Sequence, residues 1–254
     1  MHRFFMLQEN FQGEQVVFTG QQAHQIRNVL RMGPGDHVIV LDNTGFEYTA
    51  ILTKIDRQEV VGEMIYKQRA QGEPRTQITL YQGLLAREKF EWVLQKCTEV
   101  GAARFVPTVT ERSIVRRPDT VTARRLSRWR RIITEAAEQS GRGRIPQLEA
   151  PVNFPDAVSE LGGFDRCLIG SPQAGGPSLR ELLRAGDTEP VVVALLIGPE
   201  GGFTDEEVQL AQASGASPIS LGRRILRTET AAVVASALIL HELGELVPKT
   251  GSGQ

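Results

Sequence analysis

The chain has 254 residues, of which 41% are hydrophobic and 23% charged, and its formal net charge is −1. These values are typical of a globular protein with one large or two ordinary domains. They exclude a disordered or fibrous chain, and no stretch approaches the roughly 20 apolar residues of a membrane helix. Two cysteines are too few for a disulfide framework, and the N-terminal apolar run stops at Gln8, too early for a signal peptide. We therefore expect a cytoplasmic protein.

The first part of the chain predicts a small β-barrel. Five short runs rich in Val, Ile, Phe, Thr and Tyr are typical of strands, at residues 3–7, 15–19, 37–41, 47–55 and 59–67. Turn sequences lie at residues 33–36 and 42–45, and one short helix is predicted over residues 21–31. Residues 68–75, which include Gly72 and Pro74, are typical of a linker, so the first domain is predicted to be residues 1–72.

After the linker, strands alternate with helices. Strands are predicted at residues 77–84, 104–110, 165–170, 191–197 and 218–221. Helices are predicted at residues 88–100, 120–140, 178–184, from 204 onward, and at 230–246. This alternation predicts an α/β domain around a mostly parallel sheet over residues 73–247, followed by a flexible tail at 248–254. Cys97, Trp92 and Trp129 lie beside apolar neighbours on helices and are predicted to belong to the core.

The net charge hides a strong asymmetry. Residues 104–144 contain eleven arginines, no lysine and four acidic residues, a local charge of +7. A clustered positive patch is typical of a surface that binds polyanions, and a solvated helix face is the alternative. Apolar residues at helical spacing in the helix at 120–140 predict that Arg124, Arg125, Arg128 and Arg131 face outward. The preceding loop extends the patch with Arg112, Arg116 and Arg117.

The sharpest local feature is a glycine-rich segment at residues 196–203, Leu-Ile-Gly-Pro-Glu-Gly-Gly-Phe. It follows an apolar strand and precedes a helix whose start is marked by Thr204 and Glu207, at the spacing of a capping box. Glycines at the carboxyl end of a strand let a ligand approach the backbone closely. The segment is neither a Walker A loop nor a Gly-x-Gly-x-x-Gly motif, and a tight strand-to-helix turn is the alternative.

A second polar segment, residues 221–231, leaves the next strand and enters the last helix. It contains a glycine, three arginines, a glutamate and two threonines, either of which could cap the helix. Two such loops at neighbouring strand ends would form two sides of one pocket. A third cluster, residues 138–142, closes the arginine-rich helix. The four histidines have no metal-ligand spacing, so no metal site is predicted.

Together, residues 196–203, 221–231 and 138–142 resemble the ribosomal RNA small-subunit methyltransferases that methylate a uridine at N3 (the RsmE type), which belong to the SPOUT class of knotted methyltransferases. Residues 1–5, which include Arg3, match as well. So do His24 with residues 29–31, which include Arg31, and residues 89–101 and 110–113. The resemblance therefore extends over most of the chain.

The resemblance implies a PUA-like RNA-binding barrel, a deep trefoil knot in the α/β domain, and S-adenosylmethionine bound in that knot. It also implies a homodimer with its active site near the subunit interface, acting on small-subunit ribosomal RNA or the assembled subunit. The implied cofactor residues are Leu196, Gly198, Glu200, Gly201, Gly202, Leu221, Leu226, Thr228, Thr230 and Ala231. The predicted RNA-binding residues, which include arginines of the positive patch, are Arg3, Arg31, Arg112, Arg116, Arg117, Arg124, Arg125 and Arg128.

The chemistry of such a reaction indicates what the site must supply. Uracil N3 carries a proton, so the site needs a base, or cations that stabilise the anion once the proton has left. Arg227, Glu229 and Arg142 are the candidates. The target base is expected to be single-stranded or flipped. Two alternatives stay open: methyl transfer to a ribose 2′-hydroxyl or a guanine, and a non-catalytic RNA-binding or ribosome-assembly factor.

Overall fold

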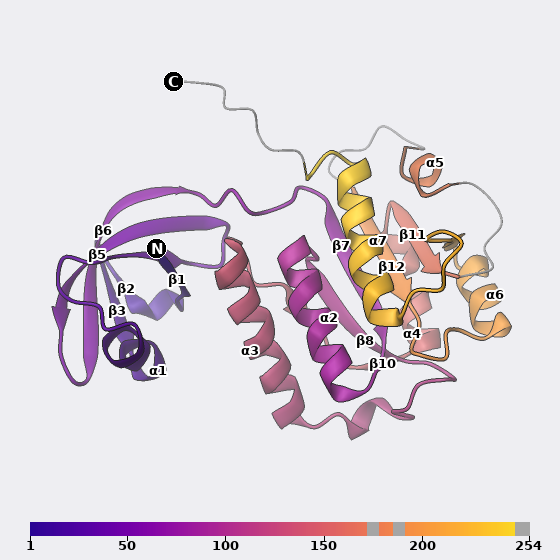
Figure 1. The fold of residues 1–254 in the computed structure, drawn as a ribbon, viewed down its shortest axis with the longest axis horizontal. Helices are drawn as coiled ribbons and strands as arrows, with labels where there is room; N and C mark the ends of the chain where they lie inside the picture. Colours follow the sequence, from indigo (N-terminus) through magenta and orange to yellow (C-terminus); the bar gives the residue numbers. More distant parts are fainter. Residues whose placement is uncertain (172–177, 185–190, 247–254) are drawn as a thin grey trace. The chain divides into compact units, whose positions relative to one another are not determined.

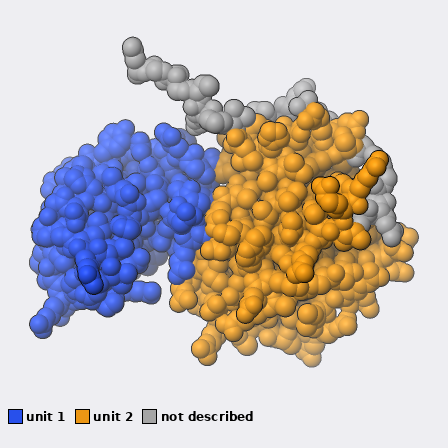
Figure 2. Space-filling model, viewed as in Figure 1, with its two compact units in different colours: residues 1–73, 134–145 blue, residues 74–133, 146–254 orange. Residues whose placement is uncertain are grey.

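The computed structural model describes residues 1–171, 178–184 and 191–246 (Figure 1). The chain divides into two compact units, which Figure 2 shows in different colours. Unit 1 contains residues 1–73 and 134–145, and unit 2 contains residues 74–133 and 146–254. The sequence-based division placed residues 134–145 with the second domain, whereas their contacts lie within unit 1.

Unit 1 is built on a mixed six-stranded sheet, barrel-like as predicted. Its strands are β1 (His2–Phe5), β2 (Phe11–Gln12), β3 (Gln15–Thr19), β4 (His37–Leu41), β5 (Phe46–Ile55) and β6 (Glu59–Arg69). The order is β1-β4-β5-β6-β3-β2, with β1 parallel to β4 and the other neighbours antiparallel. Alternate apolar side chains such as Phe4, Phe18 and Val38 form one core with Ile26. The two-residue strand β2 is too short for an alternating pattern to predict.

The helix predicted over residues 21–31 is wrong in extent. The structure has a short helix α1 (Gly20–His24) followed by a π-helical turn (Gln25–Val29), and a 3-10 turn (Gln8–Asn10) lies earlier in the chain. Arg31 lies beyond these turns with a φ of 54°. A positive φ is uncommon for a residue other than glycine, and it ends the helical run.

Residues 134–145 join unit 1 because β1 is apolar on both faces. Phe5 points away from the core that contains Phe4 and packs with Leu41 and Ala137. The backbone NH of Phe5 donates to Glu138 Oε1 at 3.0 Å. The pKa of Glu138 is raised, mainly by burial. The second segment therefore supplies part of the hydrophobic cover of unit 1.

Unit 2 is built on a parallel sheet. Its strands are β7 (Gln77–Gly83), β8 (Arg104–Val109), β9 (Gln147–Leu148), β10 (Val152–Asn153), β11 (Arg166–Gly170), β12 (Val192–Ile197) and β13 (Ser217–Ile219). The order is β10-β8-β7-β12-β11-β13, and β9 pairs with β8. Both alternating sets along β12 are buried: Ala194 and Leu196, and also Val193 and Leu195. Helices must therefore cover both faces of the sheet.

The helices of unit 2 are α2 (Arg87–Val100), α3 (Ala123–Ser140, which continues into unit 1), α4 (Phe154–Ser159), α5 (Leu179–Arg184), α6 (Asp205–Ala213) and α7 (Thr228–Glu242), with 3-10 turns at Pro118–Thr120 and Leu161–Gly163. Phe154 of α4 and Ala211 of α6 share a core with Leu196. α7 packs beside α2 and contacts β7 and β12 (Figure 1). None of the described helices is long and apolar enough to cross a membrane.

Several predicted elements are corrected by the structure. The last helix begins at Thr228, two residues earlier than predicted, and ends at Glu242. The helix predicted from residue 120 begins at Ala123, because the 3-10 turn precedes it. β9, β10 and α4 were not predicted, because they are too short to show a period. The predicted tail at 248–254 lies outside the described residues.

The predicted core residues are confirmed in two of three cases. Trp129 is fully buried, with its ring centroid 4.4 Å from that of Phe90, and Cys97 is fully buried as well. The prediction for Trp92 is wrong, because its side chain is 42% exposed on α2.

Candidate active site

The site lies where three neighbouring strands of unit 2 end. β12, β11 and β13 are adjacent and parallel, so Ile197, Gly170 and Ile219 lie at the same edge of the sheet. The loops that follow β12 and β13 enclose a pocket of about 520 Å³. This volume falls in the usual range for small-molecule sites, and the edge is where open α/β sheets bind ligands.

The first wall is the glycine-rich loop that follows β12. The NH of Gly202 donates to the carbonyl of Pro199 at 2.9 Å, and Gly202 has a φ of 70° that favours glycine. The loop also passes very close to the end of β7. A Cβ added at Gly83 would lie 2.5 Å from the backbone nitrogen of Pro199. Gly83 therefore allows the loop to pack against β7. The predicted capping box follows. The Thr204 hydroxyl accepts a hydrogen bond from the backbone NH of Glu207, and the Glu207 carboxylate accepts one from the backbone NH of Thr204.

The second wall follows β13 and ends at the first turn of α7. The Thr228 hydroxyl donates to the carbonyl of Gly198 and thereby joins the second wall to the first. The buried Gln82 at the end of β7 supports the same junction. Its Nε2 donates to Thr228 Oγ1 at 3.1 Å and to the carbonyl of Gly198 at 3.3 Å. Two side chains thus hold the two loops together.

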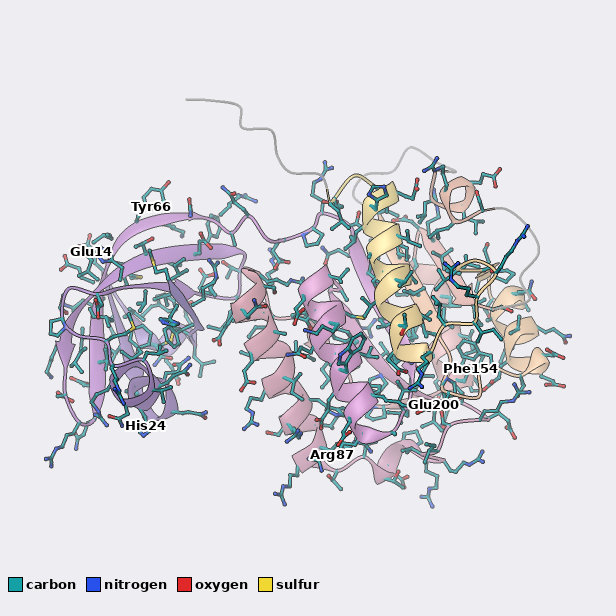
Figure 3. The ribbon with its side chains drawn as sticks, in the orientation of Figure 1. Glu14, His24, Tyr66, Arg87, Phe154 and Glu200 are labelled. Atoms are coloured by element: carbon teal, nitrogen blue, oxygen red, sulfur yellow. The ribbon has the colours of Figure 1, made fainter. Side chains whose placement is uncertain are left out.

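Glu200 gives the first wall a fixed negative charge. Burial raises the pKa of its carboxyl, but backbone hydrogen bonds and the Lys89 ammonium outweigh burial, so this pKa lies below its ordinary value. Lys89 Nζ lies 3.1 Å from Glu200 Oε1. The label in Figure 3 shows Glu200 on the loop near the start of α7. Lys89 on α2 thereby fixes the position of the loop.

Among the charged side chains of the second wall, Arg227 and Glu229 lie at the start of α7 and are available to a ligand. Arg227 is the residue before the first turn of α7; its exposed guanidinium makes no hydrogen bond or ion pair with the described residues. Glu229 lies in that first turn, and its Oε2 is buried without a hydrogen-bond partner in the described part of the chain. A buried acceptor without a partner is costly unless a ligand supplies a donor or a cation. Arg227 and Glu229 therefore offer a cation and a carboxylate to a ligand in the pocket.

The predicted cofactor residues mostly line this pocket. Gly198, Glu200, Gly201, Gly202, Leu221, Leu226, Thr228 and Ala231 do so, together with Arg227 and Glu229. Leu196 and Thr230 are not among the lining residues, since Leu196 points into the core. Five further lining residues belong to the two predicted loops but were not named as cofactor residues: Ile197, Pro199, Gly222, Arg224 and Ile225. Five others lie outside those loops and were not predicted: Lys89, Gly170, Ser171, Ile219 and Ser220. Gly170 and Ser171 could have been found, because Gly170 ends a predicted strand that lies beside β12 and Ser171 follows it directly.

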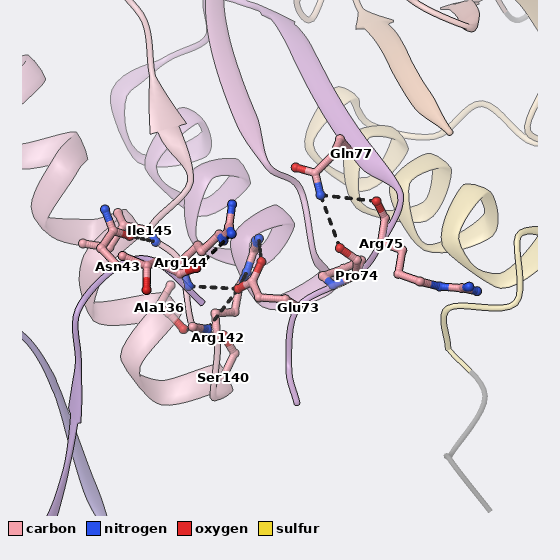
Figure 4. A network of polar contacts seen from close by, with 12 residues as sticks. Asn43, Glu73, Pro74, Arg75, Gln77, Ala136, Ser140, Arg142, Arg144 and Ile145 are labelled. Atoms are coloured by element: carbon pink, nitrogen blue, oxygen red, sulfur yellow. Dashed lines mark hydrogen bonds and ion pairs between the residues drawn. The ribbon is translucent and has the colours of Figure 1, made fainter. Parts of the chain in front are cut away.

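Arg142 does not line the pocket, which is formed entirely by unit 2. The residue belongs to unit 1, where its side chain is 3% exposed and holds the carboxylate of Glu73 through two bonds of 3.0 Å (Figure 4). The backbone NH groups of Gly143 and Arg144 donate to the same carboxylate. These contacts support the fold of unit 1, and the catalytic role of Arg142 stays a prediction.

Several of the predicted RNA-binding arginines have partners within the protein. Arg112 donates to the carbonyls of Gly201 and Phe203, at 3.0 and 3.1 Å, and so supports the glycine-rich loop. The remaining pairs are Arg3 with Glu47, Arg116 with the carbonyl of Glu111, Arg117 with Asp119, and Arg128 with Glu91. Arg31 and Arg124 are exposed, and Arg125 is half-buried. The RNA-binding role of all eight stays a prediction.

Comparisons with known proteins agree with this geometry. A model of the RNA methyltransferase domain matches residues 72–240, and a model of the RNA methyltransferase PUA domain matches residues 18–65. The chain is 37% identical to ribosomal RNA small subunit methyltransferase E of Synechocystis, over 88% of this chain and 72% of the relative. The corresponding protein of Bacillus subtilis is 32% identical, over 88% and 89%.

A solved structure extends the similarity to three dimensions. Ribosomal RNA small subunit methyltransferase E from Neisseria gonorrhoeae, bound to S-adenosylmethionine, superposes with a TM-score of 0.83 at 32% identity. The match covers 95% of this chain and 97% of that one. The similarity therefore extends over most of both units.

Proposed function

Because the chain belongs to the ribosomal RNA small subunit methyltransferase E family, we propose that it methylates N3 of a uridine in small-subunit ribosomal RNA, with S-adenosylmethionine as the donor. The observation that carries the proposal is the pocket at the ends of β12 and β13, where Thr228 joins the two loops.

The residues of the pocket fit S-adenosylmethionine. Ile197, Ile219 and Leu226 provide apolar surface for an adenosine, and peptide groups at the strand ends can bond its polar edges. The unpartnered carboxylate oxygen of Glu229 suits a cationic ligand. When bound, the cofactor supplies a methyl group activated by a sulfonium centre, which needs no metal. We propose that the glycine-rich loop and residues 221–231 hold it, within the trefoil knot that the family resemblance implies.

The chain itself must deal with the proton on N3. We propose that Glu229 accepts this proton and that Arg227 stabilises the negative charge that then spreads over the two flanking carbonyl oxygens of the uracil. The N3 lone pair can then form the new N–C bond while the donor's C–S electron pair returns to sulfur. Arg142, already held by Glu73, is proposed to support the fold of unit 1 instead.

We propose a homodimer as the active form. α7 carries apolar residues on all sides rather than on one stripe, and Leu238 on this helix is 39% exposed. A helix with apolar residues all around is typical of one that is buried on all sides. The PUA-like unit 1 and the exposed arginines are proposed to bind the RNA around an accessible target base. Since the proposed substrate belongs to the ribosome, we place the protein in the cytoplasm.

The decisive experiment is transfer of a labelled methyl group to small ribosomal subunits that lack this modification, followed by nucleoside digestion. Label in 3-methyluridine is expected. Label in a 2′-O-methylated nucleoside or a methylguanosine would support methyl transfer to RNA but contradict uridine N3 as its target. RNA binding without any label, in the presence of bound S-adenosylmethionine, would favour a non-catalytic assembly factor.

A further inference from the structure

A second hollow in unit 2, of about 680 Å³, is surrounded by arginines and shares no lining residue with the cofactor pocket. We call it the arginine basin, and its arginines are Arg87, Arg124, Arg125, Arg128 and Arg131. Arg87 begins α2 and is labelled in Figure 3, and the other four lie on α3. Thr122 and Ser127 add two hydroxyl groups to the lining.

The spacing along α3 produces the basin. Arg124, Arg128 and Arg131 are four and three residues apart, so they share one face of the helix. With a rise of about 1.5 Å per residue, they extend over about 10 Å. That length exceeds one phosphate group and suits consecutive phosphates of one strand.

The basin has a rigid floor. Arg125 lies with its guanidinium carbon 4.8 Å from the ring centroid of Trp129, which is fully buried against Phe90. Glu91 holds Arg128 through two bonds of 2.6 and 2.7 Å and lies 3.3 Å from Arg87. The hydrogen bond from Arg128 lowers the pKa of Glu91, although burial opposes it. Guanidinium groups fixed in advance lose little entropy when they bind an anion.

The charge of the basin is incompletely balanced. Within the described part of the chain, Arg124 and Arg125 form no ion pair, and Arg125 Nε is buried without an acceptor. Burial lowers the pKa of Arg125; the charge of Glu91 opposes this effect, and the charge of Arg87 adds to it. A bound anion would relieve both the repulsion and the missing hydrogen bond. Arginine suits phosphate particularly well, because its planar fork can form two parallel bonds.

We propose that the arginine basin binds phosphodiester groups of the RNA substrate, with Arg124 and Arg125 as its main contacts and Glu91 as the residue that positions Arg87 and Arg128. The inference rests on the proposed function for the identity of the RNA. It adds a binding site on α2 and α3 that is separate from the cofactor pocket.

The test compares two double variants with the same change in charge. Arg124→Gln/Arg125→Gln removes two basin cations, and Arg75→Gln/Arg180→Gln removes two exposed cations elsewhere in unit 2. Affinity for a fluorescein-labelled single-stranded RNA 20-mer is measured by anisotropy between about 50 and 200 mM salt. Each lost phosphate contact lowers the salt slope by about 0.7 for a single strand, so we expect a decrease of about 1.4 for the basin variant and little change for the control.

Further measurements separate the possible failures. Unchanged binding of S-adenosylmethionine would show that the basin double variant is folded. If the double variant does not fold, the single variant Arg124→Gln, at an exposed position, is tested in its place. Equal salt slopes for basin and control variants would overturn the inference. The inference would also be overturned if the basin bound inorganic phosphate but the basin variant kept the wild-type salt slope for RNA binding. Absence of 3-methyluridine with the wild-type protein would instead contradict the proposed function, whatever the slopes show.

Discussion

Arg227 and Glu229 are the two charged side chains at the start of α7 whose polar atoms are left for a ligand. If Arg227 stabilises the uracil anion, Arg227→Ala should lower kcat about 100- to 1000-fold, the usual effect of losing one such donor. The Kd of S-adenosylmethionine, measured by calorimetry, should stay nearly constant. Arg223→Ala is the matched control, because Arg223 is exposed in the same loop but does not line the pocket. Equal turnover of the two variants would remove Arg227 from the mechanism.

Gln82 supports the pocket without lining it. Gln82→Leu keeps the volume but leaves the Gly198 carbonyl and the Thr228 hydroxyl without their shared donor, at a cost of about 1–3 kcal/mol. We expect S-adenosylmethionine to bind at least tenfold more weakly in a titration. Thr228→Val should weaken it similarly, and Thr228→Ser, which keeps the hydroxyl, should not. Wild-type affinity in Gln82→Leu would show that the loops hold together without this amide.

Burial protects the Cys97 thiol. It raises the pKa of Cys97 from 9.0 to about 12. The folded protein therefore keeps the thiol protonated, whereas the unfolded chain ionises near pH 9, so this group lowers the free energy of unfolding as the pH rises from about 9 toward 12. The test uses the variant Cys167→Ser, in which Cys97 is the remaining cysteine. At pH 8, iodoacetamide should leave Cys97 unmodified in the native variant and modify it in the urea-unfolded variant, as measured by mass spectrometry. Rapid modification of the native protein would contradict this.

At the scale of elements, the packing of the glycine-rich loop on β7 depends on a missing side chain. Gly83→Ala would place a Cβ 2.5 Å from the backbone nitrogen of Pro199. The backbone of residue 83 fixes the position of this Cβ, so no side-chain rotation can relieve the overlap. We expect lower stability in urea and weaker binding of S-adenosylmethionine. Gly162→Ala is the control, since a Cβ there meets nothing within 4 Å. Similar behaviour of both variants would mean that the loop adapts to the added methyl group.

The elements also show what the sequence could predict. The continuous apolar run of β12 and the helical period of α2 are long enough to be recognised, and the boundaries of both elements were predicted within a few residues. The two-residue strands β9 and β10 were missed because they form only through pairing with β8. The pocket loops were found because glycine-rich and arginine-rich segments follow predicted strands. Lys89 was missed as a pocket residue, because only the fold brings α2 to the loop.

At the scale of the whole molecule, Arg142 connects the two sequence segments of unit 1. Arg142→Ala would leave the mostly buried Glu73 carboxylate without its cation, which costs about 3 kcal/mol for such a pair. We expect unit 1 to unfold at a lower urea concentration while unit 2 still binds S-adenosylmethionine. Arg57→Ala, at an exposed position of the same unit, should change little. If Arg142→Ala lost methyl transfer but unfolded at the same urea concentration as the wild type, Arg142 would again be a catalytic candidate.

Unit 1 is discontinuous in the chain, and this has a consequence for biosynthesis. Residues 1–73 leave the ribosome first, yet Ala137, Glu138 and Arg142, which complete their core and hydrogen bonds, follow only after residues 74–133. The amino-terminal unit therefore cannot reach its final state co-translationally until much of unit 2 has been made. A fragment that ends at Glu73 would expose the face of Phe5 and Leu41, whereas a fusion that restores residues 134–145 would cover it.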